Sequence, residues 1–328
     1  MAKLRDLIGV MKDKASQGKA ALLSKRATLS LLRATSHDSF TPPTPKQLST
    51  LLSFGDGSRT AAAAAIEILM DRLQKTQNSA VALKCLIAVH HIIKHGAFIL
   101  QDQLSVYPAS GGRNYLKLSN FRDNNSPISW ELSSWVRWYA QYIEQLLCSS
   151  RTLGFFLGSK SSSDAESQEE RVSGLMNADL LRETDALVTL IDEVGRKPVC
   201  GSTKGNRLVE EIENLVGKDL DSIMKEVCVR LKEFRERLGC LSFGEAVELV
   251  YELKRMEESR EMKTMVVEQS FWDAVREVKE KANQEVVKEE VKAYKTVRRH
   301  RASESDRFER SVLNSADYLR FPSGRLLL

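Results

Sequence analysis

Histidine and cysteine, the side chains that most often carry catalytic or metal chemistry, are few in this chain and poorly spaced for a shared site. His90 and His91 are adjacent, and neighbouring helix positions point about 100° apart, so both rings cannot bind one metal ion. No two cysteines have the CxxC spacing of a metal or redox site, and we expect reduced thiols at Cys85, Cys148, Cys200, Cys228 and Cys240. The motifs GxSxG and HExxH, the Walker loop and the dinucleotide fingerprint are absent. The sequence therefore predicts a protein that is not an enzyme and that has no metal or cofactor.

Positive charge is the second chemical feature, and it is concentrated at the N-terminus. Residues 1–33 contain eight basic and two acidic residues, whereas all 328 residues together have a net charge of only +5. The rest of the chain is therefore close to neutral, and the N-terminal segment is suited to an anionic surface. The basic residues are Lys3, Arg5, Lys12, Lys14, Lys19, Lys25, Arg26 and Arg33.

An apolar stripe with helical spacing runs through the same segment. Its members are Leu4, Leu7, Ile8, Met11 and Ala15, and they lie opposite Lys3, Asp6, Asp13 and Lys14 on a helical wheel. This pattern predicts a helix that lies in a membrane interface. The alternative is a first helix that packs against the next one and leaves its lysines in solvent.

The element expected at the centre of the fold is the helix over residues 80–96. Apolar residues occupy nearly all of its sides, leaving little more than Lys84 and one edge for solvent. Asn78 or Ser79 can cap its start, and Gly96 stands where a left-handed C-cap is common. Such a helix needs neighbours on every side.

Further amphipathic segments predict a mostly helical chain around it, because Leu, Ala, Glu and Lys are abundant and Gly and Pro are few. We expect roughly ten helices, stacked as antiparallel neighbours into a curved solenoid. The expected segments are 20–34, one beginning at Lys46, 59–75, 97–104, 128–150, 175–194, 207–238, 242–256 and 260–294. No apolar run is long enough to span a membrane, and no signal peptide precedes the first helix, so we expect a cytosolic protein.

Composition divides the chain into five parts. Residues 1–19 are a basic amphipathic segment, 20–158 a helical region, 159–171 a flexible Ser/Glu-rich loop, 172–297 the C-terminal helices of the same solenoid, and 298–328 a disordered tail.

Four segments resemble, in order, signature segments of the ANTH domain of monomeric clathrin assembly proteins. They are LLRATSHD at 31–38, ALKCLIAVHHIIKHG at 82–96, NYLKLSNFRD at 114–123 and SSWVRWYAQYIEQLL at 133–147. The resemblance is strong over residues 20–158 and rests on helical pattern and length from 172 to 295. The short segment after the domain is similar to that of plant members.

This resemblance implies an all-α fold, a right-handed superhelical solenoid of stacked antiparallel helices of the ENTH/ANTH kind. It implies a lipid-binding endocytic adaptor that binds phosphatidylinositol 4,5-bisphosphate and helps clathrin coats to assemble. The implied partners are acidic phosphoinositide membranes and the clathrin heavy chain, with SNARE cargo and adaptor complexes as further ones. The implied location is the cytoplasmic face of membranes, in clathrin-coated pits and vesicles at the plasma membrane and Golgi.

The family's lipid motif is Lys, nine residues, Lys, any residue, Lys or Arg, and then His or Tyr. Here Arg33 stands at the first position and, after one inserted residue, Lys46 at the third, whereas Thr44 and Gln47 replace the other two. The predicted lipid-binding residues are Arg33 and Lys46, with Lys25, Arg26 and His37 as substitutes. We expect attraction to acidic lipid with little choice of headgroup.

Two short patterns could bind coat proteins, but neither is strong. Asp179-Leu180-Leu181 falls on a helix whose leucines should be buried, and a tyrosine pattern at 318–321 is common by chance. The expected tail lacks NPF and DPF, so we expect coat association with low direct affinity for clathrin. The competing hypothesis is a helical-repeat scaffold that binds other proteins; nucleic-acid binding is disfavoured because residues 1–33 contain no aromatic residue.

Overall fold

The computed structural model describes residues 2–22, 26–37, 40–105, 116–158, 165–199, 201, 203–261 and 269–312. Within these ranges all regular structure is helical, as the sequence predicts, and no strand is present. The α-helices are α1 (Ala2–Leu22), α2 (Arg26–Ala34), α3 (Pro45–Leu52), α4 (Arg59–Lys75), α5 (Ser79–His95), α6 (Phe98–Ser105), α7 (Pro127–Leu153), α8 (Ala165–Ser173), α9 (Asn177–Gly195), α10 (Arg207–Arg237), α11 (Phe243–Glu261) and α12 (Gln269–Val312). Short 3-10 turns follow α3 and α10, at Ser53–Asp56 and Leu238–Cys240. Each helix in the described ranges is too short or too polar to cross a bilayer.

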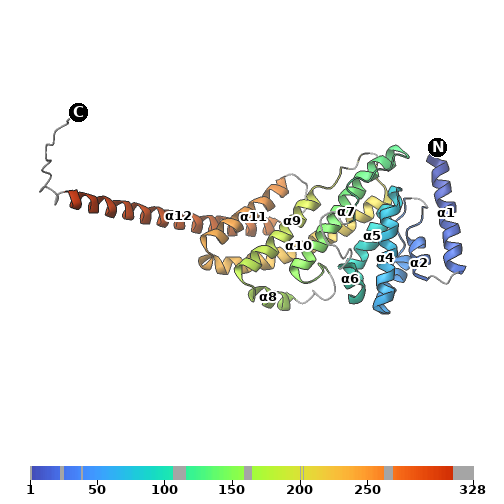
Figure 1. Cartoon of the computed structure of the whole chain (residues 1–328), viewed down its shortest axis with the longest axis horizontal. Helices are drawn as coiled ribbons and strands as arrows, with labels where there is room; N and C mark the ends of the chain where they lie inside the picture. Colours follow the sequence, from blue (N-terminus) through green and yellow to red (C-terminus); the bar gives the residue numbers. More distant parts are fainter. Residues whose placement is uncertain are drawn as a thin grey trace, which may run out of the picture.

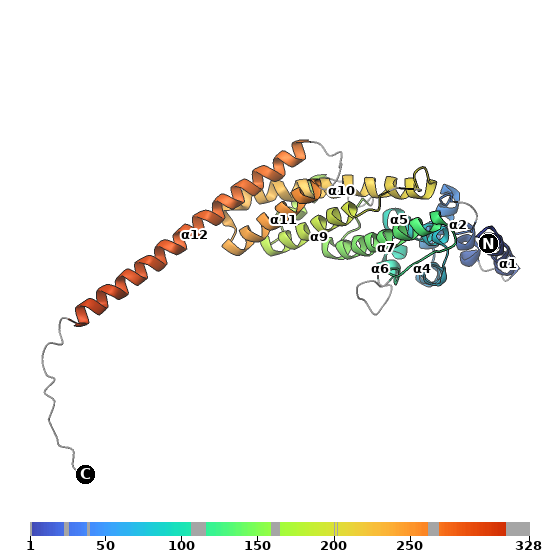
Figure 2. The ribbon, with the colours of Figure 1, turned by 90° about the horizontal axis from the view of Figure 1, so that it is seen from above.

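The helices stack in chain order into an elongated solenoid, which confirms the predicted architecture. Helices α2, α4, α5, α7, α9, α11 and α12 each contact the next in that series, and α10 runs along α5, α9 and α12. Helix α1 contacts α2 at one end of the stack, and α12 projects from the other end (Figures 1 and 2). The expected membrane-binding segment therefore lies at one extremity of the molecule.

Helix α5 is the buried centre that the sequence predicts. The side chain of Asn78 accepts a hydrogen bond from the Val81 N–H at 3.0 Å and so caps the first turn. Every residue from Ser79 to Lys94 is buried except His91. The expectation that Lys84 stays in solvent is wrong: it is 2% exposed, and its ammonium donates a hydrogen bond to the carbonyl oxygen of Ser36 at 2.9 Å. A buried ammonium needs such a partner, which a helical wheel does not reveal.

Gly96 ends α5, but not in the left-handed conformation that we expected. Its φ is −65° and its ψ is 145°, and its N–H donates to the carbonyl oxygen of Ile92 at 2.9 Å. A Cβ atom at this position would lie 2.5 Å from that same oxygen. Glycine is thus required here for the close approach of the chain and not for a positive φ.

One hydrophobic core continues from α2 to α12, and a buried polar cluster joins the helices at its middle. The carboxylate of Asp219 on α10 lies 2.7 Å from His90 Nε2 and 2.7 Å from the Tyr142 hydroxyl, and it also pairs with the Lys94 ammonium. Burial alone would raise the pKa of Asp219, but the charges and hydrogen bonds of His90 and Lys94 lower it to about 2. This cluster binds α5 and α7 to α10, so the two sides of the Ser-rich segment pack as one body.

Two segments expected to lack structure contain helix. Residues 165–173 form α8, where Val172 is buried and Arg171 pairs with Glu183 of α9 at 3.0 Å. Helix α12 continues past Arg298 to Val312, so the first half of the expected tail is helical. Both stretches are polar, but they are rich in strong helix formers and contain no glycine or proline, and the apolar pattern alone misses that. The remaining parts, 159–164 and 313–328, lie outside the described residues.

Candidate functional site

Arg33 and Lys46 lie at the exposed turn that connects α2 to α3. Arg33 is in the last turn of α2, Lys46 is in the first turn of α3, and both are exposed. The two helix ends are joined because the Gln47 side-chain amide donates to the carbonyl oxygen of Arg33 at 2.8 Å. Arg26 is exposed two helical turns before Arg33 and therefore on the same side of α2. Lys25 lies outside the described residues.

Thr44 and Gln47, which occupy the second Lys position and the His or Tyr position of the resembled motif, have a local structural role. The Thr44 hydroxyl accepts the Gln47 N–H, and the Gln47 side chain accepts the Thr44 N–H at 2.8 Å, which is a reciprocal capping box. Pro45 at the first helical position has no N–H to offer. The start of α3 can therefore give an anion little more than the N–H of Lys46, and the lysine side chain must supply most of the attraction.

His37 is not a free ligand on this surface, because it forms part of a polar clasp that holds α1. We use that name for Asp13, His37 and Arg72. Asp13 Oδ2 lies 2.7 Å from His37 Nδ1 and also accepts the His37 N–H at 2.7 Å, while Asp13 Oδ1 accepts from Arg72 at 3.0 Å. Arg72 also donates to the carbonyl oxygen of Thr35 at 2.6 Å. The His37 ring lies so close to Gly9 of α1 that a Cβ there would be 2.7 Å from it.

The clasp depends on the ionised form of Asp13. Burial alone would raise the pKa of this carboxyl, but hydrogen bonds from His37 and the charge of Arg72 outweigh burial and lower the pKa below its ordinary value. Asp13 is 5% exposed, so it faces the body of the protein from the polar side of α1.

Leu7, Ile8 and Met11 of the apolar stripe are consequently exposed to solvent. Leu7 is 57% exposed, Ile8 42% and Met11 63%, whereas Asp13 and Ala20 on the inner side are buried. Helix α1 contacts α2, while these three residues of the stripe stay exposed. A surface helix normally buries its apolar face. Helix α1 instead buries part of its polar side and exposes apolar residues. This orientation favours the predicted interfacial helix over the alternative, in which the apolar stripe packs against the next helix.

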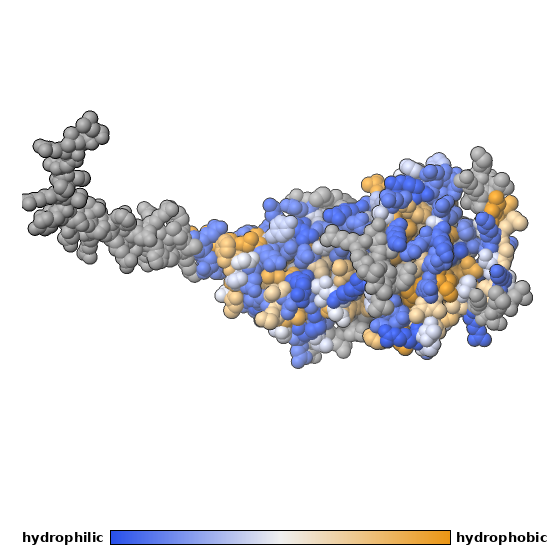
Figure 3. Space-filling view, viewed as in Figure 1, coloured by the Kyte–Doolittle hydropathy of each residue, from blue (hydrophilic) through white to orange (hydrophobic). Residues whose placement is uncertain are grey.

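Exposed basic side chains lie on the same helix as this stripe and on the two helices that follow it. Lys12, Lys14 and Lys19 of α1 are exposed, as are Arg26, Arg33 and Lys46 nearby in the chain. Figure 3 shows apolar and hydrophilic side chains intermixed at the end of the molecule where α1 lies. Exposed apolar side chains bordered by cations are the combination that binds an anionic lipid surface.

The Asp-Leu-Leu tripeptide at 179–181 is not available as a binding motif. Leu180 and Leu181 are 0% and 1% exposed, and Asp179 pairs with Arg182 at 2.6 Å, so the Asp-Leu-Leu tripeptide belongs to the core. The tyrosine pattern at 318–321 lies outside the described residues. Across the part of the chain that the structure describes, no cluster of three His, Cys, Asp or Glu side chains could hold a metal ion.

Sequence reasoning missed the roles of Asp13 and Arg72. It placed Asp13 correctly on the polar side of the first helix but assumed that this side meets water. A useful signal is present: Asp13 is one of only two acids among ten charged residues in 1–33, and it lies opposite the stripe. Arg72 lies far away in sequence, and only the packing of α4 beneath α1 brings it to Asp13.

Comparisons with known proteins found a family model and several relatives that match this chain. The protein-family model described as "ANTH domain" matches residues 27–262. Three Arabidopsis thaliana proteins, each named "putative clathrin assembly protein", are similar to this chain. One is 48% identical over 98% of this chain and 93% of its own length. A second is 36% identical over 71% of this chain and 69% of its own length. The third is 31% identical over 80% of this chain and 91% of its own length.

Proposed function

Because the chain belongs to the ANTH-domain family, we propose that it is a phosphoinositide-binding endocytic adaptor that helps clathrin coats to assemble on membranes. The observation that carries the proposal is the orientation of α1. Asp13 is held inward by the clasp, and Leu7, Ile8 and Met11 are exposed on the same helix as Lys12, Lys14 and Lys19. A protein that stayed in water would gain stability by burying this stripe.

The lipid-binding surface in this proposal comprises Lys25, Arg26, Arg33 and Lys46, with the exposed residues of α1 beside them. His37 contributes by fixing α1 through Asp13 and only secondarily as a ligand. A basic residue held at an anionic leaflet contributes about 1 kcal/mol, so several together give reversible adhesion. Because Thr44 and Gln47 cap α3 and carry no charge, we expect this surface to attract acidic lipid without choosing strongly among headgroups.

The coat-related part of the proposal rests on the names of the relatives. Under it the protein acts on the cytoplasmic face of membranes in clathrin-coated pits and vesicles, at the plasma membrane or Golgi, with the clathrin heavy chain, SNARE cargo and adaptor complexes as its partners. Residues 20–158 form the lipid-binding region, and residues 172–297 complete the same solenoid.

A charge-reversal variant tests the lipid-binding surface. Arg33→Glu combined with Lys46→Glu should abolish sedimentation with liposomes that contain phosphatidylinositol 4,5-bisphosphate, because both exposed cations become anions at the same turn. Charge-matched phosphatidylserine liposomes should bind the wild type only a few-fold less well. The matched control is Lys204→Glu with Lys218→Glu, two exposed lysines at the α9–α10 connection and on α10 that change the net charge equally.

Equal recruitment of the charge-reversal variant and the wild type would rule out this surface. Equal loss in both double variants would mean that net charge alone attracts the protein to lipid. If wild-type protein ignored all acidic liposomes, the helical-repeat scaffold for protein partners would become the better account.

A further inference from the structure

A threonine that is followed by a proline occupies the turn between α2 and α3. Residues 41–45 have the sequence TPPTP, and Thr44 and Pro45 are both exposed. Thr44 has an extended backbone, with a φ of −70° and a ψ of 154°, and protein kinases bind their substrate segments in an extended conformation. Pro45 has no N–H, and a proline directly after the hydroxyl residue is what proline-directed kinases recognise. The turn therefore presents a hydroxyl group in the form that such a kinase uses.

The hydrogen bonds of the Thr44 hydroxyl lie within the first turn of α3. The hydroxyl donates to Gln47 Oε1 at 3.0 Å and accepts the Gln47 N–H at 3.4 Å. A phosphate ester on this oxygen loses the donor but brings oxygens that can accept the same N–H. Leu48 and Leu51, which anchor α3 in the core, are buried and keep their packing. The modification is therefore compatible with the fold.

Two cations of the proposed lipid-binding surface lie beside this hydroxyl. The side chain of Gln47 accepts the Thr44 N–H at 2.8 Å and donates to the Arg33 carbonyl oxygen at 2.8 Å, so it holds Thr44 next to the end of α2. Lys46 follows Thr44 by two residues. Both cations are exposed, and in the part of the chain that the structure describes neither side chain has a carboxylate partner. They can therefore pair either with a lipid headgroup or with a phosphate on Thr44.

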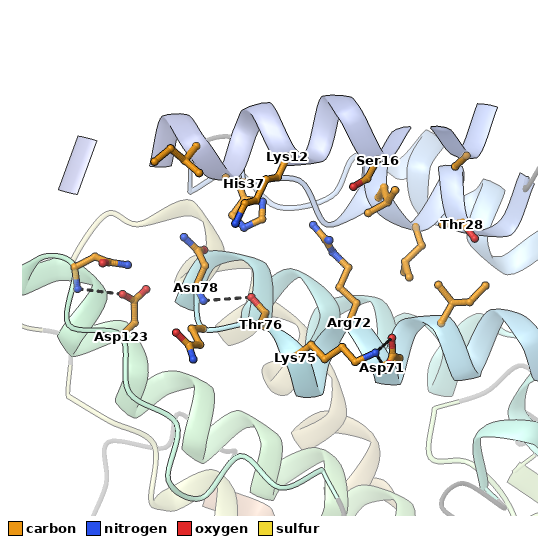
Figure 4. A pocket seen from close by; sticks show the side chains of 18 of the residues that line it. Lys12, Ser16, Thr28, His37, Asp71, Arg72, Lys75, Thr76, Asn78 and Asp123 are labelled. Atoms are coloured by element: carbon orange, nitrogen blue, oxygen red, sulfur yellow. Dashed lines mark hydrogen bonds and ion pairs between the residues drawn. The ribbon is translucent and has the colours of Figure 1, made fainter. Parts of the chain in front are cut away.

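The cations in the cavity of about 930 Å³ between α1 and α4 differ in this respect (Figure 4). Arg72 pairs with Asp13 at 3.0 Å, and Lys75 pairs with Asp71 at 2.6 Å. Figure 4 shows the second pair on the α4 wall of the cavity. A phosphate on Thr44 is therefore expected to act on the α2–α3 turn and not on this cavity.

We propose that Thr44 is a phosphorylation site and that its phosphate switches off the lipid-binding turn. In the step, Thr44 Oγ forms a bond to the γ-phosphorus of ATP, the bond from this phosphorus to the β–γ bridging oxygen breaks and ADP leaves, and the hydroxyl proton passes to a carboxylate base of the kinase. The ester has a charge of about −1.5 to −2 at pH 7, which offsets the charges of Arg33 and Lys46 and repels an anionic leaflet. The switch rests on the proposed function, whereas the phosphorylation site does not.

Incubation of the full chain with MgATP and a proline-directed kinase, followed by mass spectrometry, tests the phosphorylation site. We expect phosphate on Thr44. Thr41 also precedes a proline but is less exposed, and peptide mapping separates the two threonines. A synthetic peptide of residues 40–50 shows that the kinase is active. Phosphorylation of Thr44 in the peptide but not in the folded chain would overturn the site.

Sedimentation with liposomes of phosphatidylserine and phosphatidylinositol 4,5-bisphosphate tests the switch. The phosphorylated chain should bind at least about tenfold more weakly than the unmodified chain, because two lipid-facing cations are neutralised, and a phosphatase should restore binding. Thr44→Glu, which adds part of the charge, should change binding in the same direction. The matched control is Ser167→Glu, at an exposed position on α8 far along the solenoid (Figure 1), which should bind like the wild type.

Equal binding by the phosphorylated and the unmodified chain would overturn the switch. Equal loss in Thr44→Glu and Ser167→Glu would also overturn it, because negative charge would then act from any position on the molecule. A wild type that ignores acidic liposomes would contradict the proposed function and the switch with it. The mass-spectrometric result needs no lipid, so it still decides whether Thr44 is a phosphorylation site.

Discussion

At the scale of single residues, Asp13 decides how the N-terminal helix is oriented. It is a buried acid in a basic segment, and its carboxylate holds both His37 and Arg72. Leaving a partly buried guanidinium without its carboxylate partner is costly, so this contact determines which side of α1 faces inward. The exposure of the apolar stripe is thus a consequence of one ionic contact on the opposite side of the helix.

Asp13→Asn should release α1 without unfolding the solenoid. The amide keeps the shape of the side chain but loses the charge, and we expect a loss of about 1–3 kcal/mol in the stability of the α1 contact. Hydrogen exchange should accelerate in α1 and remain slow in α5, which is buried on all sides. Unchanged exchange in α1 would show that the clasp does not hold it.

The same clasp predicts an acid dependence. Asp13 has a lowered pKa in the folded protein, so its stabilising effect is complete above the ordinary value of 3.8 and is lost as the pH falls through the folded pKa. In Asp13→Asn the amide exchange rate of α1, corrected for the intrinsic effect of pH on exchange, should no longer depend on pH in this range.

At the scale of elements, the interface between α9 and α11 contains the most perturbed acid of the C-terminal half. Glu252 on α11 is 5% exposed and lies 2.9 Å from Arg255, which also pairs with Asp185 and Asp192 of α9 at 2.8 Å and 2.7 Å. Burial and the nearby Asp185 raise the pKa of Glu252 to about 7, against the opposing charge of Arg255. Arg255 is shared by three carboxylates, and Glu252 is the most buried of the three. Glu252 is therefore the carboxylate that binds a proton most readily.

The interface should therefore weaken as the pH rises. Glu252 binds its proton more tightly in the folded protein than in the unfolded chain, so its contribution to stability is full below about 4.5 and is lost as the pH rises toward 7. Urea unfolding of Glu252→Gln should show a smaller loss of stability between pH 5 and pH 8 than the wild type. Glu258→Gln, at an exposed position on the same helix, is the control and should keep the wild-type slope. An unchanged slope in Glu252→Gln would contradict the raised pKa.

The helices themselves were largely predictable because most of them bury an apolar stripe, as α7 and α9 do. Helix α8 and the end of α12 were missed because charged residues with high helix propensity leave no apolar period to detect. Lys84 was misplaced for a different reason: the partner of its ammonium is a backbone oxygen 48 residues earlier, which no local pattern reveals.

At the scale of the whole molecule, the proposed lipid contacts all lie at the α1 end of the solenoid. The sequence located this end through its charge and its apolar stripe, and family resemblance supplied the expected lipid residues. It could not show that His37 is engaged by Asp13, or that α1 and α4 enclose a cavity, because both depend on the packing of helices distant in sequence.

The central claim is that the outward stripe of α1 inserts into an acidic membrane. The direct measurement is sedimentation of the full chain with acidic liposomes for Leu7→Ser with Met11→Ser, which removes two large members of the stripe and changes no charge. The control is Phe243→Ser with Tyr251→Ser, a similarly exposed aromatic pair about two turns apart on α11, at the other end of the stack. Burial of a large apolar side chain contributes about 1.5–3 kcal/mol, so losing two should weaken binding more than tenfold. The account predicts that loss for the α1 pair and wild-type binding for the α11 pair; binding by the Leu7/Met11 variant equal to that of the wild type would contradict it.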